Sequence, residues 1–124
     1  MPYKLTWERS GIYRQYYGDV TVFERRASLN AIWSDPRFDD LRYAITNYLE
    51  VNSYEVREDA TVEIAALHIG PLRTNPRIVI AAVAVRPDIV ADIQAFINLQ
   101  FTAAPYRLFP TLDKARRWID GVDS

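Results

Sequence analysis

The run Ile78–Val85, with the sequence Ile-Val-Ile-Ala-Ala-Val-Ala-Val, is apolar at every position. A strand that faces water on one side alternates apolar and polar residues, whereas a strand covered on both sides is apolar throughout. Arg86-Pro87-Asp88 follows the run, and proline near the first turn of a helix loses no hydrogen bond. The clearest helical stripe of the chain comes next, made of Ile89, Val90, Ile93, Phe96 and Ile97. The sequence therefore predicts an interior strand that leads into a helix packed on its sheet.

The other segments continue this alternation of strands and helices. Strands are expected at Tyr3–Glu8, Ile12–Tyr17, Leu41–Asn47, Ile78–Val85 and Tyr106–Phe109. Helices are expected over 21–33, 60–72, 86–97 and 111–119. The predicted order is β-β-α-β-α-β-α-β-α, in one domain that spans residues 1–124. The opening strands must be antiparallel because their connection is too short for a parallel crossover, whereas later strands lie parallel. We predict an α/β fold with a five-stranded mixed sheet and four helices.

Local signals set the expected boundaries of these elements. Gly18-Asp19 is predicted to end the second strand, and Thr21 with Glu24 forms a capping box for the first helix. Glu50–Asp59 is polar and is predicted to be a connection. Gly70-Pro71 is expected to kink or end the second helix, because proline removes a donor and clashes with the preceding turn.

Composition excludes several classes of function. The formal net charge is -1, so a general nucleic-acid or membrane-surface binder is not expected. The sequence has no cysteine, which excludes thiol catalysis and thiolate metal sites. No apolar run approaches the roughly 20 residues that span a bilayer, and the N-terminus lacks the apolar core of a signal peptide. We expect a cytoplasmic location and no membrane span.

A search for catalytic motifs assigns no catalytic, cofactor-binding or metal-ligating residue. The four glycines lie too far apart for a phosphate-binding loop. His68 is the single histidine and is interpreted as a structural, partly exposed residue, because a metal ligand would need partners. The acidic groups Asp35/Asp39/Asp40 and Glu55/Glu58/Asp59 are interpreted as solvated loop and helix-terminal charges. We predict a protein that is not an enzyme and needs no cofactor.

Aromatic residues gather on the first two strands, namely Tyr3, Trp7, Tyr13, Tyr16 and Tyr17. Two interpretations stay open. Tyrosine and tryptophan are favoured anchors in ligand pockets and at partner surfaces. Alternatively, the rings pack across the strands under a helix.

Three segments carry a family resemblance. They are Gly18-Asp19-Val20-Thr21, the stretch from Asp35-Pro36-Arg37-Phe38-Asp39 to Leu41-Arg42-Tyr43, and Phe109-Pro110-Thr111 followed by Ala115-Arg116-Arg117-Trp118-Ile119. In this order the chain resembles the SpoIIAA-like family of small bacterial proteins, which is related to STAS domains and more distantly to CRAL-TRIO lipid-transfer domains. The resemblance implies a SpoIIAA/STAS-like layer structure.

The resemblance also bears on function. Anti-sigma factor antagonists of the family carry a phosphorylatable serine at the start of the helix after the third strand. Ser53 is the nearby serine here and the candidate phosphosite, without the Asp before it or the Gly after it that relatives have; Asn47 stands where relatives often have an acid. The resemblance implies a non-enzymatic regulatory or protein-interaction module.

Two further expectations concern ligands and assembly. The alternative function is binding or carrying a small apolar, lipid-like ligand, which would leave a closed apolar cavity beneath the helix that begins near Pro87. A first strand at the sheet edge could also pair two copies as a homodimer.

Overall fold

The computed structural model describes residues 2–123 of the chain. The strands are β1 (Tyr3–Trp7), β2 (Gly11–Val20), β3 (Tyr43–Tyr54), β4 (Val79–Val83) and β5 (Tyr106–Phe109). The helices are α1 (Val22–Trp33), α2 (Glu58–Leu67), α3 (Ile69–Thr74), α4 (Pro87–Leu99) and α5 (Leu112–Asp123), with a 3₁₀ turn, η1, at Pro36–Asp40. This is the predicted order of elements.

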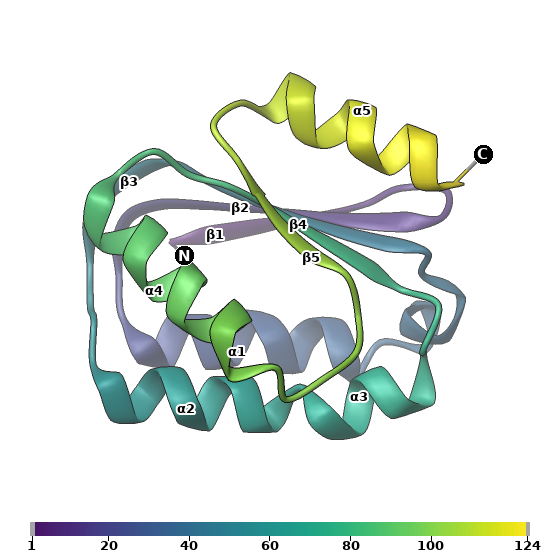
Figure 1. Cartoon of the computed structure of the whole chain (residues 1–124), viewed down its shortest axis with the longest axis horizontal. Coiled ribbons are helices and arrows are strands. Elements are labelled where there is room, and N and C mark those ends of the chain that lie inside the picture. The colour runs from purple at the N-terminus through teal and green to yellow at the C-terminus, as the bar shows by residue number, and fades with distance from the viewer. Residues whose placement is uncertain (1, 124) are drawn as a thin grey trace.

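The strands lie side by side in their order along the chain, β1-β2-β3-β4-β5. β1 is antiparallel to β2, as predicted, and every later pair is parallel. Right-handed crossovers that always step in one direction place their helices on one face of the sheet. Figure 1 shows α1, α2 and α3 on that face and α5 on the opposite one.

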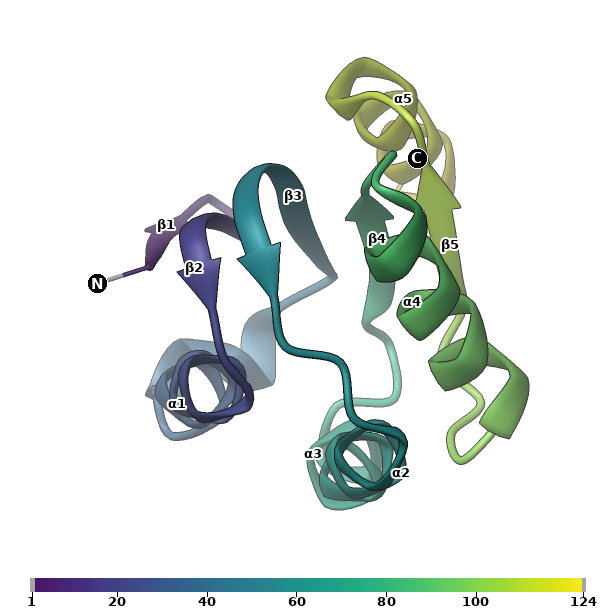
Figure 2. The same ribbon diagram turned by 90° about the vertical axis from the view of Figure 1, so that its left-hand side faces the viewer.

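Each face of the sheet has its own core. On the crossover face, Ile89 and Ile93 of α4 pack against Tyr16, Tyr48 and neighbouring strand residues. On the far face, Ala115 and Ile119 of α5 cover Ile45, Val83 and neighbours on β3 and β4. β4 is buried on both sides, which confirms the interpretation of Ile78–Val85 as an interior strand. Figure 2, turned by 90°, shows the two layers of helices with the sheet between them.

Three predicted strand ends are wrong. β4 stops at Val83, so Val85, which is 62% exposed, lies outside the strand predicted at Ile78–Val85. β2 continues through Gly18-Asp19 to Val20, because Gly18 adopts φ +68° and the pairing with β3 shifts register there. The extra residue at this irregularity lies on β3, because Gly18 pairs with Val51 whereas Asp19 pairs with Ser53, and glycine tolerates the left-handed conformation that β2 adopts at Gly18. β3 extends to Tyr54, so the first half of the predicted connection Glu50–Asp59 is strand that pairs with the end of β2.

The helix signals are confirmed. Thr21 Oγ1 accepts the Glu24 N–H at 3.4 Å, and a Glu24 carboxylate oxygen accepts the Thr21 N–H at 3.1 Å. The predicted second helix divides at His68 into α2 and α3. Pro71 explains the division, because it has no N–H for the carbonyl of Leu67, where α2 ends.

Gly11 gives the first testable prediction. Gly11 pairs with Tyr43 across β2 and β3, and a Cβ on Gly11 would lie 2.1 Å from the Tyr43 ring. The ring cannot swing freely, since its hydroxyl donates to Glu8, which pairs in turn with Arg116 of α5 at 2.6 Å. We expect Gly11→Ala to lower the free energy of unfolding by about 1–3 kcal/mol in urea denaturation, as overpacking usually does. The double variant Gly11→Ala/Tyr43→Ala should lose less unfolding free energy than the sum of the two single losses. Full additivity would contradict a clash between the new methyl group and the Tyr43 ring.

Candidate functional site

Ser53 lies within β3 and not at the start of a helix. Its hydroxyl donates to Asp19 of β2 at 2.7 Å, and the residue is exposed. The N-cap of α2 is Arg57, four residues further on. Ser53 therefore sits on the strand that leads to α2, accessible and held beside a carboxylate.

Asn47 has a structural place on the same strand. It is buried, its amide donates to the Tyr13 hydroxyl at 3.0 Å, and its carbonyl oxygen accepts the Leu49 N–H at 2.8 Å. The Asn47 amide therefore acts as both a hydrogen-bond donor and an acceptor inside the sheet. An ionised acid at this position could act only as an acceptor.

Exposed apolar side chains lie on β2, on β3 and just after β4, near the level at which β4 ends. Tyr17 of β2 is 43% exposed and Leu49 of β3 is 41% exposed. The register brings them together, because Gln15 pairs with Asn47 and Tyr17 with Glu50. Val85, 62% exposed, lies two residues beyond Val83, which pairs with Asn47 from the other side. We call Tyr17, Leu49 and Val85 the strand-end patch.

The aromatic set of the first two strands is divided between the two faces of the sheet. Tyr16 is buried on the crossover face, with the Tyr3 ring edge-on at 6.4 Å and Tyr48 at 5.3 Å. Trp7 joins the same face beside Ile12, while Tyr13 packs with the α5 cluster on the other. Tyr17 belongs to the strand-end patch. The five rings therefore do not line one common pocket.

The acidic groups make local contacts. Asp35 caps η1 and pairs with Arg37 at 2.8 Å; the side-chain hydrogen bond from Arg37 and its backbone N–H lower the pKa of Asp35 to about 2. Glu55 accepts the N–H of Val22 at the start of α1, at 2.8 Å. Among residues 2–123, no three acidic or histidine side chains come close enough to hold a metal ion. No helix in the same range is long and apolar enough to cross a bilayer.

His68 is buried, not partly exposed as predicted. Its ring lies edge-on between Trp33 at 5.0 Å and Phe96 at 4.9 Å, and Nδ1 donates to the Ile64 carbonyl at 2.7 Å. Burial lowers the pKa of His68 to about 4, so the imidazole is neutral at pH 7.

A buried polar network beneath α4 went unpredicted. Asp92 of α4 pairs with Arg25 of α1 at 2.7 Å, accepts the Tyr54 hydroxyl at 2.7 Å, and also accepts the hydroxyl of Thr61. Beside it, Arg14 of β2 donates to Thr46 at 3.0 and 3.1 Å and to Ser28 at 2.8 Å. Scattered arginines carry no sequence motif. Their positions in the sequence could have indicated burial. Arg14 lies on the same face of its strand as Ile12 and Tyr16, and Asp92 precedes Ile93, which belongs to the apolar stripe of its helix.

The arrangement of sheet and helices is the SpoIIAA-like fold. One solved structure that shares it is the anti-sigma factor antagonist SpoIIAA in its unphosphorylated form, with a TM-score of 0.58 and 15% identity over 96% of this chain and 98% of that one. Another is an uncharacterised protein with a SpoIIAA-like fold from Shewanella loihica, with a TM-score of 0.53 and 11% identity over 94% of this chain and 91% of that one. No protein-family model and no curated protein matches the sequence. The predicted fold class is confirmed.

Proposed function

We propose that the chain is a non-enzymatic regulatory or protein-interaction module of the SpoIIAA/STAS type, which binds a protein partner through the strand-end patch. The observation that carries the proposal is the patch itself, since three apolar side chains on β2, on β3 and just after β4 are open to solvent. Apolar and aromatic side chains of this kind are the usual anchors of protein interfaces. The similarity to an anti-sigma factor antagonist supports the same class of function.

Within the proposal, phosphorylation of Ser53 regulates binding at the strand-end patch. It lies on β3 four residues after Leu49, is exposed, and already contacts Asp19. A phosphate there would add a charge of roughly −1.5 to −2 beside an existing carboxylate and would remove the hydroxyl donor. Phosphorylation would therefore repel Asp19 and alter the end of the β2–β3 pair.

The strand-end patch can be tested with two matched substitutions. We expect Leu49→Asp to abolish capture of the partner, because a charge at an apolar contact must be desolvated on binding. Val62→Asp is the control, since Val62 of α2 is exposed to a similar degree, 43% against 41% for Leu49. Cross-linked pull-downs from the source cells, quantified by mass spectrometry, should show one protein that is retained by wild type and Val62→Asp and reduced at least tenfold by Leu49→Asp.

Equal recovery by the two variants would place the interface elsewhere. Repeated recovery of no specific protein by the wild-type chain would count against an interaction module altogether.

The proposal also includes a homodimer through β1, which lies at the edge of the sheet. An edge strand has free backbone donors and acceptors that a second copy could pair with.

The alternative, a carrier of a small apolar ligand, has weaker support. A hollow of about 420 Å³ lies between α3 and the segment before β5, lined by Leu72, Phe101 and Ala104 among others. The space directly beneath α4 is only about 40 Å³, and its lining mixes arginine, tyrosine, histidine and aspartate side chains with the apolar ones of Leu29, Ile64, Ile93 and Phe96. The residues beneath α4 therefore do not form the closed apolar cavity that a lipid chain would need.

A further inference from the structure

The cavity beneath α4 has an excess of positive charge. It lies between the sheet and α1, α2 and α4, and the charged side chains around it are Arg14, Arg25 and Asp92. Asp92 neutralises Arg25. Arg14 is 9% exposed and bonds only to the neutral hydroxyls of Thr46 and Ser28, with no carboxylate in ion-pair range among the described side chains. His68 adds no charge at pH 7, so the cluster carries a net charge of +1.

A buried guanidinium cannot remove this charge by losing its proton. A buried charge without a counter-ion costs several kcal/mol, and other ionisable groups avoid that cost by changing protonation state. The Tyr16 ring, whose centroid lies 4.8 Å from the guanidinium carbon of Arg14, stabilises this charge without neutralising it, whereas an anion from solution would neutralise it.

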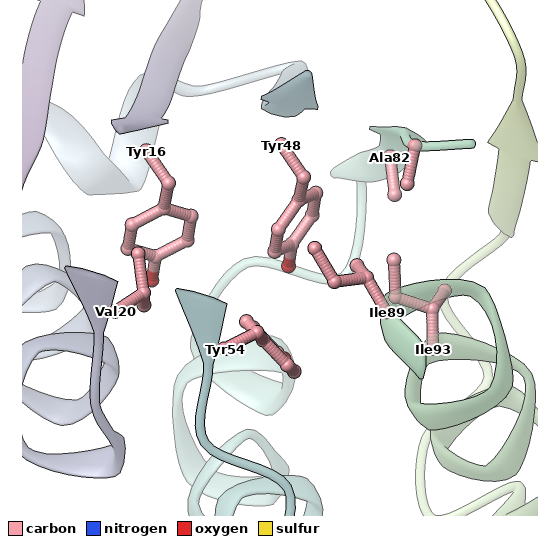
Figure 3. Close-up of a cluster of buried hydrophobic side chains, with 8 residues drawn as sticks. Tyr16, Val20, Tyr48, Tyr54, Ala82, Ile89 and Ile93 are labelled. Atoms are coloured by element: carbon pink, nitrogen blue, oxygen red, sulfur yellow. The ribbon is translucent and has the colours of Figure 1, made fainter. Parts of the chain in front are cut away.

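Hydrogen-bond donors at the cavity are also left without acceptors. The Arg25 side chain is only 8% exposed, and its Nε and Nη2 atoms are fully buried with no partner. Tyr48 and Tyr106 line the same cavity. Burial raises the pKa of both phenols, that of Tyr106 to about 12, so both stay protonated and can donate. In Figure 3 the Tyr48 hydroxyl points toward Tyr54 and lies beside Ile89, whereas the Tyr16 hydroxyl lies beside Val20.

We propose that this cavity binds a small, planar, monovalent oxyanion, such as formate or nitrate, between Arg14 and Arg25. The charge of the ligand matches the excess of one positive charge. Its size fits, because a cavity of about 40 Å³ holds roughly three waters at 10–15 Å³ each. Its planar oxygens suit the fork of a guanidinium, which pairs with such groups through two parallel N–H bonds.

The site also has a route to the surface. A hollow of about 170 Å³ at the end of α4 shares Phe96 and Tyr106 with the inner cavity. The two rings lie 5.2 Å apart and line both spaces. A rotation of Phe96 would let a small anion pass, whereas tetrahedral sulfate is too large and too highly charged for the inner site.

Thermal unfolding of the full chain tests the proposal. Sodium formate or nitrate replaces sodium gluconate at constant ionic strength, because gluconate is too large to enter. For the wild-type protein we expect a saturable rise in Tm of roughly 5 °C at tenfold excess over Kd, since the ligand binds only the folded state. Arg14→Met keeps an unbranched apolar stem, removes the guanidinium with its unneutralised charge, and should abolish the rise. Arg9→Met, at an exposed position, should respond as wild type does.

A second measurement covers the case in which Arg14→Met does not fold. Line broadening of ¹³C-formate by the wild-type protein should be strong and should weaken at least threefold in Tyr106→Phe, which loses only a donor. Three outcomes overturn the proposal. They are no effect of formate or nitrate up to 0.5 M, an equal Tm rise with sulfate, or an equal rise in Arg14→Met.

Discussion

Replacing Asp92 with asparagine should lower the free energy of unfolding by about 3–5 kcal/mol, the usual cost of removing one partner of a buried ion pair. Asp92 is the only carboxylate at a cluster with two buried arginines, and it accepts from Arg25, Tyr54 and Thr61. The amide cannot neutralise Arg25, so two guanidiniums would be left buried without a counter-ion. Urea denaturation at pH 7 measures the loss.

Two controls separate charge from packing at Asp92. Asp88→Asn on the same helix removes a half-exposed ion pair with Arg86 and should cost about 1 kcal/mol or less. The double variant Arg25→Met/Asp92→Leu removes both charges of the pair and should be more stable than Asp92→Asn alone, because Arg25 no longer leaves a buried charge without its counter-ion, although the Tyr54 and Thr61 hydroxyls lose an acceptor. A double variant that is less stable than Asp92→Asn would show that the hydrogen bonds of the network stabilise the fold beyond the neutralisation of Arg25.

Lowering the pH from 7.5 to 5 should reduce the free energy of unfolding by about 2 kcal/mol, at 1.36 kcal/mol for each unit of pKa difference. The cause is His68, whose pKa is about 4 in the folded protein against an ordinary value of 6.5. As the pH falls below 6.5, the unfolded chain takes up a proton that the folded chain does not. The stability is therefore complete above pH 6.5 and declines between 6.5 and 4.

His68→Gln provides the control, because it removes the only histidine of the sequence. Its unfolding free energy should be nearly constant from pH 7.5 to 5. Glu8 and Asp35, whose pKa values are lowered on folding, contribute little in this range, because their ordinary values of 4.5 and 3.8 lie below pH 5 and both groups stay largely ionised in the unfolded chain as well. A wild-type protein with the same flat profile would show that His68 is accessible to solvent.

The sequence predicted the layers of the fold because burial leaves a periodic pattern. Ile78–Val85 indicated an interior strand and the Ile89–Ile97 stripe indicated a packed helix, and both are confirmed. The boundaries at Gly18 and Tyr54 could not be predicted, because the bulge depends on how two distant segments pair. Glycine next to aspartate usually marks a turn, whereas here the pairing with β3 carries the strand past it.

The buried charges were beyond prediction for a related reason. Arg25, Asp92 and Tyr54 come from three separate elements, and only the fold brings them into contact. Each is an ordinary polar residue in its own segment. The aromatic set shows the converse, since residues close together in the sequence were separated to opposite faces by the alternation of the strand.

The placement of α5 has a consequence for synthesis of the chain. All crossover helices lie on one face, so Ile45, Val79 and Val83 on the other face are covered by α5. α5 follows every strand in the sequence, and domains emerge from the ribosome with the N-terminal part first. Until α5 has been translated, the nascent sheet presents an uncovered apolar face. Chaperone binding to the nascent chain is therefore expected before α5 emerges.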